Sequence, residues 1–405
     1  MIFSTIAVSG DVKDHLLDAD RRAAAARWHR ERGFARCYVS TYRGGYWTPD
    51  EAMADIKKAF RAEGIEPCGC VCPDAFGFPS TGWKDTACYS RPEPREALRR
   101  VFAHAARHFD RILIDNRLFF DCSCDRCRRE RGARSWTAYH TEILTDVFER
   151  DVLAPARAVN PACHLILKYP SWYEAMASRG YDVVGHARLF SEVCAGTETR
   201  DPASDRWGRR QPIGSYVGAA WMRDAAGGNC HSAWFDAIDC PGGVYHEQIR
   251  GSVLAGCREM IFFCFGAFQR LEPAAARLSP SSEKPSPYPH PADMLDAALS
   301  RRDELEALSA LVAADPPAGM AAYRAPGADA RGEPYVFDFM AMLGLPIRPV
   351  ATFPSQAPCA AFAQSSFAES GFIPQLREYI ESGRATLLTR RLADELPGAL
   401  SRRPN

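Results

Sequence analysis

The stretch Phe109-Asp-Arg-Ile-Leu-Ile-Asp115-Asn116 is a short apolar run that ends in a carboxylate and an amide. Such a run, bounded by polar residues, is typical of a buried strand that delivers its last side chains to a loop. Six residues farther along, the chain reads Cys122-Ser-Cys124-Asp-Arg-Cys127. The segment therefore predicts a strand, a functional carboxylate and a metal-binding loop close together.

Seven further short runs resemble this strand, and amphipathic or Ala/Arg-rich stretches separate most of them. Such alternation predicts right-handed βαβ units and a parallel sheet. Eight strands in about 265 residues match a closed (β/α)8 TIM barrel. An open doubly wound sheet is the competing fold, but no Gly-rich dinucleotide fingerprint follows the first strand. The expected strands are residues 3–9, 35–41, 67–73, 111–115, 164–169, 182–193, 230–236 and 259–266, and the expected helices are residues 19–32, 49–63, 94–108, 135–159 and 243–257.

A second pattern follows the predicted barrel. Residues 278–291 are rich in Pro and Ser and predict an ordered excursion or a flexible loop. A helix is expected over residues 292–313, and alternating strand and helix patterns then run from residue 319 to residue 389. We therefore predict a TIM-barrel catalytic domain over residues 1–315 and a small α/β domain over residues 316–405, which ends before a complete three-layer domain would.

Composition excludes several functional classes. Fifty basic residues balance fifty acidic ones, so no net charge directs the protein to nucleic acid or to an anionic membrane. No apolar run approaches the roughly 20 residues of a membrane helix, and the amino terminus lacks the basic flank of a signal peptide. The fifteen cysteines are odd in number, and several occur singly in strand-like runs. This pattern favours reduced thiols and a cytoplasmic location.

A TIM barrel carries its active site at the carboxyl ends of its strands, so the residues there are the candidates. Carboxylates from different strands beside aromatic rings suit a carbohydrate substrate, because paired carboxylates cleave glycosidic bonds. The predicted catalytic residues are Asp115, Glu192 and Asp236. The predicted substrate-binding residues are Tyr169, Trp172, Trp234, Glu198, Arg200 and Glu247.

Each of these residues also has a structural interpretation. A single Asp after a strand is often a turn or capping residue. Salt bridges to Arg188 or Arg200 would equally explain Glu192 and Asp236. The tryptophans commonly pack in a core, and Glu247 would be favoured in the first turn of a helix by the helix dipole.

The cysteine cluster is the more specific signal. Its C-x-C-x-x-C spacing supplies three thiolates, and a fourth ligand would complete a tetrahedral structural zinc site. The fourth candidate is Cys88, which precedes the helix that leads into the strand at 111–115. Free thiols or redox chemistry are the alternative. Cys68, Cys70 and Cys72 alternate, so they share one face of a strand and suit packing better than metal binding. The predicted metal ligands are Cys88, Cys122, Cys124 and Cys127.

The order of a lone Cys, a helix, a strand ending in a carboxylate and then C-x-C-x-x-C resembles the zinc cluster of the family 42 β-galactosidases. The resemblance implies a glycosidase barrel, with Asp115 as the acid/base and Asp236 as the nucleophile. That family carries Asn-Glu and Glu at these places, whereas this chain has Asp-Asn and Asp. The segment from Tyr335 resembles the flavodoxin-like trimerisation domain that follows those barrels, which implies a homo-oligomer, either a trimer or a dimer.

A second resemblance gives different roles. In retaining α-glycosidases an Asp that ends strand four is the nucleophile, which would make Asp115 the nucleophile and Glu192 the acid. We therefore predict a glycoside hydrolase that acts on a small oligosaccharide or glycoside. The alternatives are a barrel that binds carbohydrate without cleaving it, and a metal-dependent hydrolase using His231 or His246. The ten histidines include no His-x-His or HExxH pair, which favours a structural metal.

Overall fold

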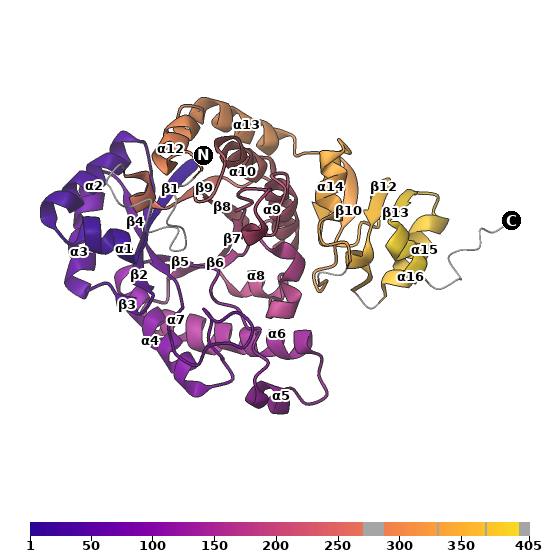
Figure 1. Ribbon diagram of the computed structural model, residues 1–405, viewed down its shortest axis with the longest axis horizontal. Coiled ribbons are helices and arrows are strands. Elements are labelled where there is room, and N and C mark those ends of the chain that lie inside the picture. Colours follow the sequence, from indigo (N-terminus) through magenta and orange to yellow (C-terminus); the bar gives the residue numbers. More distant parts are fainter. Residues whose placement is uncertain (270–286, 330–331, 369–370, 397–405) are drawn as a thin grey trace.

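Eight parallel strands close into a barrel in the larger part of the molecule (Figure 1). The computed structural model describes residues 1–269, 287–329, 332–368 and 371–396. The last strand pairs with the first, which closes the sheet and confirms the predicted (β/α)8 fold. A short strand, β3 (Tyr46–Trp47), pairs antiparallel with the end of β2. The barrel strands are β1 (Ile2–Ala7), β2 (Arg36–Arg43), β4 (Glu66–Val71), β5 (Arg111–Ile114), β6 (His164–Tyr169), β7 (Glu192–Gly196), β8 (Cys230–Asp236) and β9 (Glu259–Phe263).

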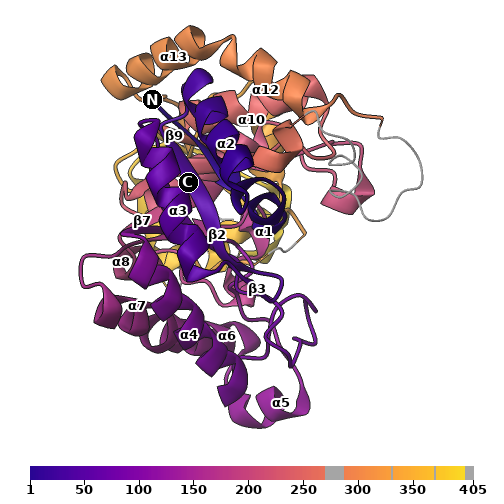
Figure 2. The same cartoon turned by 90° about the vertical axis from the view of Figure 1, so that its left-hand side faces the viewer.

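Helices surround this barrel (Figures 1 and 2). In α3 (Asp50–Ala62), Met53, Ile56 and Phe60 recur at helical spacing and are fully buried, so one face of the helix packs inward. Among the helices of the described residues, none combines the length and apolar character needed to cross a membrane. The others of this part are α1 (Ser9–Asp11), α2 (Ala19–Glu31), α4 (Pro92–His108), α5 (Asp125–Arg131), α6 (Trp136–Val147), α7 (Ala154–Val159), α8 (Gly185–Leu189), α9 (Gly214–Ala225), α10 (Gly242–Leu254), α12 (Pro291–Leu299) and α13 (Arg302–Ala314).

Two of the predicted elements differ from the structure. The strand expected over residues 182–193 is wrong, because α8 occupies residues 185–189 and β7 begins only at Glu192. The helix expected over residues 292–313 is interrupted after Leu299 and forms α12 and α13. Most of the Pro/Ser-rich segment 278–291 lies outside the described residues.

Successive side chains along each strand point in turn to the barrel interior and to the surrounding helices. On β5, Leu113 faces the interior, while Ile112 and Ile114 pack on the helix side. Cys68 and Cys70 also belong to the interior cluster, which confirms the packing role predicted for these two, whereas Cys72 follows the end of β4 and its Sγ lies 3.6 Å from Oδ2 of Asp74. An apolar middle layer thus separates polar residues at the two ends of the barrel. This layer includes Ile6, Cys70, Leu113, Ile166, Cys194 and Ile261.

A second sheet of four parallel strands forms the smaller part of the chain, drawn in orange and yellow in Figure 1. Its order, β11-β10-β12-β13, is that of the first four strands of a flavodoxin-like sheet. The domain boundary that we predict at residues 315 and 316 falls between α13 and β10. The elements are β10 (Met320–Tyr323), α14 (Val336–Met342), β11 (Ile347–Val350), β12 (Cys359–Phe362), α15 (Phe372–Glu381), β13 (Ala385–Leu388) and α16 (Arg390–Glu395).

Buried polar contacts join the two parts. The hydroxyl of Tyr173 donates to Oδ2 of Asp338 at 3.0 Å, and Nε1 of Trp221 donates to the carbonyl of Arg324 at 2.9 Å. Burial raises the pKa of Asp338 to about 7, although the hydrogen bond from Tyr173 opposes the rise. The contact between the two parts therefore includes a carboxyl group that ionises near neutral pH.

Candidate active site

Lys168 occupies the centre of the candidate site, at the carboxyl edge of the barrel. Its Nζ lies 3.9 Å from Oδ1 of Asp115 and forms an ion pair with Oε1 of Glu198. The ammonium group also lies 3.9 Å from the centre of the Trp234 ring. Burial would lower the pKa of Lys168, but Glu198, Asp115 and Asp236 raise it above its ordinary value, so the lysine stays charged.

Asp115 follows β5 directly and is buried beside two cations. Nη1 of Arg43, the last residue of β2, lies 2.8 Å from its Oδ2. The backbone N–H of Asn116 donates to its Oδ1 at 2.7 Å. Burial would raise the pKa of Asp115, but Arg43 and Lys168 hold it below its ordinary value. Asp115 is therefore an ionised carboxylate at neutral pH.

Asp236, the last residue of β8, is oriented by three neighbours. Nε1 of Trp234 donates to its Oδ1 at 3.0 Å, and Arg200 forms an ion pair with its Oδ2. Its backbone N–H donates to Oε1 of Gln248 at 3.3 Å. Arg200 has a φ of 57°, and its guanidinium stacks 3.5 Å from the Trp207 ring centre. A non-glycine residue held in this region is strained, which is common at functional sites.

Glu198 supplies a third buried carboxylate, two residues after β7 ends. Its Oε2 is buried and has no hydrogen-bond partner among the described residues. A Cβ atom at Gly196 would lie 2.7 Å from this oxygen, so the absence of a side chain there makes room for the carboxylate. Glu198 thus has one oxygen on Lys168 and one oxygen without a partner.

Glu192 lies at the opposite end of the barrel, which corrects the predicted position. It is the first residue of β7, and it pairs with Arg111 at 2.5 Å and His164 at 3.1 Å. Ser232 donates to its other oxygen at 3.0 Å. The strand expected over residues 182–193 would have placed Glu192 at its carboxyl end, whereas the observed strand begins at this residue. Its contacts close the amino end of the barrel, and the apolar layer separates it from the candidate site.

The remaining predicted binding residues divide into two groups. Trp234 and Arg200 contact the carboxylates, as described above. Tyr169 does not reach them, since it is fully buried on the helix side, where its hydroxyl donates to the carbonyl of Val183 at 2.8 Å. Trp172 lies in the loop after β6, with Arg179 4.2 Å from its ring centre.

Glu247 is exposed on α10 and lies past the first turn of that helix, and its role in substrate binding stays a prediction. The residue of α10 that contacts the site is its neighbour Gln248. Sequence interpretation also missed Arg43 and Lys168, because only carboxylates and aromatic residues were sought at the strand ends. The signal was available, since Lys168 alternates with Ile166 on the inward side of β6.

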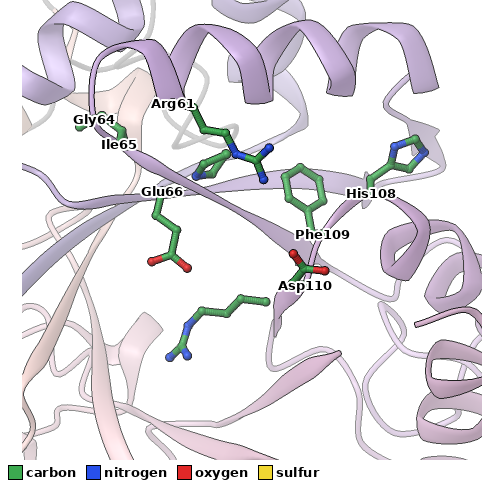
Figure 3. Close-up of a pocket in the computed structure, with 9 residues that line it drawn as sticks. Arg61, Gly64, Ile65, Glu66, His108, Phe109 and Asp110 are labelled. Carbon is green, nitrogen blue, oxygen red and sulfur yellow. The ribbon is translucent and has the colours of Figure 1, made fainter. Parts of the chain in front are cut away.

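A cavity of about 370 Å³ lies at the amino ends of β4 and β5, away from these carboxylates (Figure 3). The catalytic residues of a TIM barrel lie at the carboxyl ends of its strands. This cavity lies at the amino ends and is therefore separate from the candidate active site. Its lining residues are Arg61, Gly64, Ile65, Glu66, Pro67, His108, Phe109, Asp110 and Arg111.

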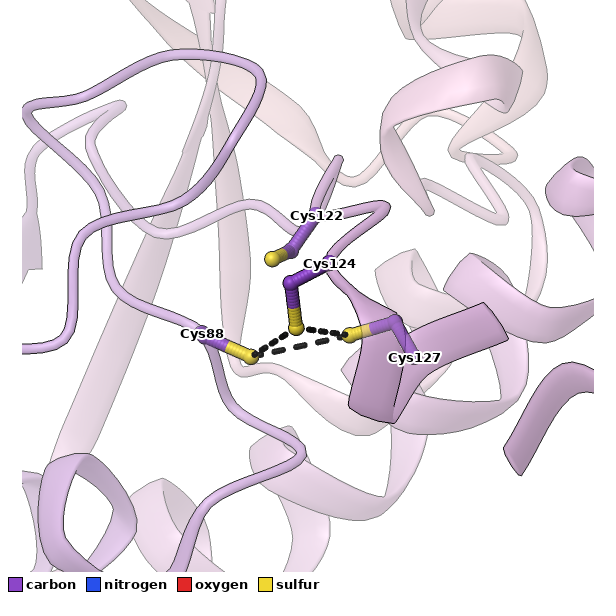
Figure 4. A group of neighbouring side chains, drawn as sticks. All are labelled: Cys88, Cys122, Cys124 and Cys127. Atoms are coloured by element: carbon purple, nitrogen blue, oxygen red, sulfur yellow. Dashed lines mark hydrogen bonds between the residues drawn. The ribbon is translucent and has the colours of Figure 1, made fainter. Parts of the chain in front are cut away.

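Four cysteine side chains meet beside the loops that follow β4 and β5 (Figure 4). Sγ of Cys88 lies 3.8 Å from that of Cys124 and 3.6 Å from that of Cys127, and the last two are 3.6 Å apart. A tetrahedral zinc ion with Zn–S bonds of about 2.3 Å would hold its sulfur atoms about 3.8 Å apart. Cys122 completes the group, whose ligand atoms all lie within 4.8 Å of one another. The four predicted cysteines therefore fit a closed tetrathiolate site.

Neither His231 nor His246 belongs to a group that could hold a metal within the described ranges. His231 is exposed on β8, and His246 lies on α10. The metal-dependent hydrolase considered above therefore has no ligand set around these residues in the described part of the chain.

Comparison with known proteins adds a family to this geometry. Residues 2–301 match the family described as a probable glycosyl hydrolase, catalytic domain. The uncharacterized protein SSO3021 of Saccharolobus solfataricus is 24% identical over 276 residues, which cover 60% of this chain and 43% of that protein. The chain thus spans less than half the length of this curated relative.

Solved structures share the architecture at low identity. The exo-β-1,4-mannosidase Op5Man5 from Opitutaceae bacterium strain TAV5 aligns with a TM-score of 0.61 and 13% identity, covering 96% of this chain and 77% of that one. A catalytic mutant of Gan42B, a GH42 β-galactosidase from G. stearothermophilus, aligns with a TM-score of 0.64 and 9% identity, covering 96% and 71%. These similarities show the fold, and the family match spans most of the chain. The chain belongs to the probable glycosyl hydrolase catalytic domain family.

Proposed function

We propose that the protein is a glycoside hydrolase that cleaves an O-glycosidic bond in a small oligosaccharide or glycoside. The observation that carries the proposal is the pair of buried carboxylates, Asp115 and Glu198, joined by the ammonium group of Lys168 at the carboxyl edge of the barrel. Membership of the glycosyl hydrolase family supports the reaction class.

The two carboxylates suit different roles. Asp115 has a pKa below its ordinary value, so it is ionised and suits the nucleophile that attacks the anomeric carbon. Glu198 has a carboxylate oxygen without a hydrogen-bond partner among the described residues, and once this oxygen has taken up a proton from solvent Glu198 suits the acid that protonates the leaving oxygen. Water then hydrolyses the glycosyl ester on Asp115 after giving its proton to Glu198. Asp236, oriented by Arg200 and Trp234, would accept hydrogen bonds from sugar hydroxyls.

The spacing of the carboxylates favours retention of configuration. Because both contact the same ammonium group, their nearest oxygens are less than about 6.5 Å apart, which is below the roughly 6.5–9.5 Å typical of inverting enzymes. Glu198 replaces Glu192 as the partner of Asp115, since Glu192 lies at the amino end of the barrel. The nucleophile role given to Asp115 is that of the second family resemblance.

The test is hydrolysis of a panel of aryl glycosides, including β-mannosides and β-galactosides because the structural neighbours act on such sugars. Asp115→Asn and Glu198→Gln should each lower the rate by about 10²–10⁴-fold. Asp20→Asn, at an exposed position on α2, is the matched control and should keep the parent rate. If both site variants keep the parent rate on every substrate cleaved, the mechanism is wrong.

Azide separates the two roles. In Asp115→Ala, azide would enter on the face left by the nucleophile and give a glycosyl azide of inverted configuration. In Glu198→Ala, azide would attack the glycosyl ester on Asp115 and give the retained configuration. Products of the opposite configurations would reverse the assignment.

One observation favours a second function, a barrel that binds carbohydrate without cleaving it. All three buried carboxylates are engaged with a cation: Asp115 with Arg43, Asp236 with Arg200 and Glu198 with Lys168. If calorimetry detects sugar binding while no glycoside of the panel is cleaved, this second function holds.

We also propose that the four cysteines bind a structural Zn²⁺. The spacing of their sulfur atoms is that of a tetrahedral tetrathiolate, and four thiolates leave no open position for catalysis. The ion would fasten the loop that carries Cys88, after β4, to the loop that carries Cys122 and Cys124, after β5, and to Cys127 in α5. Because Asp115 begins the second of these loops, the zinc would fix the backbone beside the nucleophile.

A further inference from the structure

A second group of metal-ligating side chains lies between α3 and α4, outside the candidate active site. Asp50 begins α3, and His104 and His108 occupy the last two turns of α4. The two histidines are four residues apart, so they share one face of the helix. Figure 3 shows the His108 imidazole at the border of the cavity, on the side away from Glu66.

We propose that Asp50, His104 and His108 form a site for a divalent transition-metal ion, with Zn²⁺ as the physiological class. The ion would clamp the first turn of α3 to the end of α4. Two imidazoles and one carboxylate are the ligand types that Zn²⁺ takes, and three protein ligands leave a position for water.

The distances are close to those that coordination requires. Oδ1 of Asp50 lies 3.0 Å from Nε2 of His108 and 3.4 Å from Nδ1 of His104. A tetrahedral ion with bonds of about 2.0–2.1 Å holds neighbouring ligand atoms about 3.3–3.4 Å apart. All three ligand atoms lie within 4.8 Å of one another. An ion between these atoms would replace the hydrogen bond that joins Nε2 of His108 to Oδ1 of Asp50.

Burial prepares His104 as a ligand. Its side chain is only 8% exposed, and its ring makes an edge-on contact with Trp47 at a centroid distance of 5.1 Å. Nδ1 is the nitrogen of this ring that lies near Asp50, so it is the one that would bind the ion.

Arg107 would compete with the ion for Nδ1 of His104. Its Nη2 lies 3.3 Å from Nδ1 of His104 and would have to leave when a metal binds there. The arginine side chain is exposed and can move into solvent. Its positive charge also opposes a divalent cation, which makes Arg107→Ala a variant that should strengthen binding.

The experiment titrates the full chain, first loaded at the cysteine site, with Zn²⁺ by calorimetry and measures bound zinc after gel filtration. The parent should bind a second equivalent, and His104→Ala, His108→Ala and Asp50→Asn should each weaken that binding by at least about 10–100-fold. Arg107→Ala should bind more tightly than the parent. His231→Ala, at an exposed histidine outside the group, should match the parent.

Co²⁺ distinguishes the two sites, because thiolate ligands give an intense near-ultraviolet charge-transfer band and imidazole and carboxylate ligands do not. The second equivalent of Co²⁺ should therefore bind without adding to that band. The proposal is overturned if the parent and His108→Ala bind the second equivalent equally, or if half-saturation needs more than about 1 mM metal, which is adventitious surface binding only. His108 and Asp50 lie at the surface edge of the group, so their variants test the site even if His104→Ala does not fold.

Discussion

Replacing Lys168 by methionine would remove the positive charge that the buried carboxylates share. The side chain of Lys168 is 2% exposed, and those of Asp115 and Glu198 are 4% and 7% exposed. Methionine keeps the length and the apolar stem, so the change isolates the charge. Removing one partner of a buried ion pair typically costs about 3–5 kcal/mol, because the other charge stays buried without compensation. We expect a loss of stability of this size near neutral pH.

The stability lost in Lys168→Met should depend on pH. Without Lys168, the buried Asp115 would lose one of the two cations that lower its pKa and would face Glu198 as a like charge, so the pKa of Asp115 in the folded state would rise. A folded state that binds the extra proton is favoured as the pH falls. The stability lost in the variant should therefore be largest above the raised pKa and should shrink as the pH falls through it.

The assay is guanidinium unfolding of the parent and Lys168→Met, followed by circular dichroism, at about pH 7.5 and about pH 5. Lys58→Met, at an exposed position on α3, is the control and should unfold like the parent at both pH values. If Lys168→Met also has the parent's midpoint at the higher pH, the carboxylates do not depend on this ammonium group. A loss that grows toward low pH would refute the assigned charges.

Three further predictions concern other parts of the molecule. Asp338 has a folded pKa raised to about 7, so the folded state holds a proton that the unfolded chain releases, and the free energy of unfolding should fall as the pH rises from about 4 to 7. Asp338→Asn should flatten this slope in melting temperatures measured across that pH range. An unchanged slope would mean that another group causes the pH dependence. Cys127→Ser should abolish zinc binding at the cysteine site and lower the melting temperature, whereas Cys359→Ser, outside the cluster, should do neither; equal zinc content in both variants would exclude the site. We also propose that exposed apolar residues of α14 and the turn after it mediate self-association, so Leu343→Glu, at a position 82% exposed, should convert an oligomer to a monomer in gel filtration, and a monomeric parent would rule this out.

Most of the barrel could be predicted from the sequence. The runs at β6 and β8 coincide with the predicted strands, because buried parallel strands are short apolar segments set between helical patterns. The rule that catalytic residues lie at carboxyl ends of strands selected Asp115 and Asp236, and both are at that edge. The C-x-C-x-x-C spacing, together with a lone Cys ahead of the preceding helix, selected the four thiols that meet in the structure.

The sequence by itself thus determined the type of most elements, favoured a closed parallel sheet over an open one, and selected the four cysteines, because local periodicity and spacing carry this information. Only the tertiary structure decided which end of β7 carries a carboxylate into the site. The apolar run near residue 190 does not show where α8 ends and the strand begins. Because β7 begins at Glu192, the carboxylate beyond its carboxyl end is Glu198 and not Glu192. Pairing was also decided in three dimensions, because Lys168 joins Asp115 to Glu198 across neighbouring strands. Such contacts depend on register, which a linear pattern does not contain.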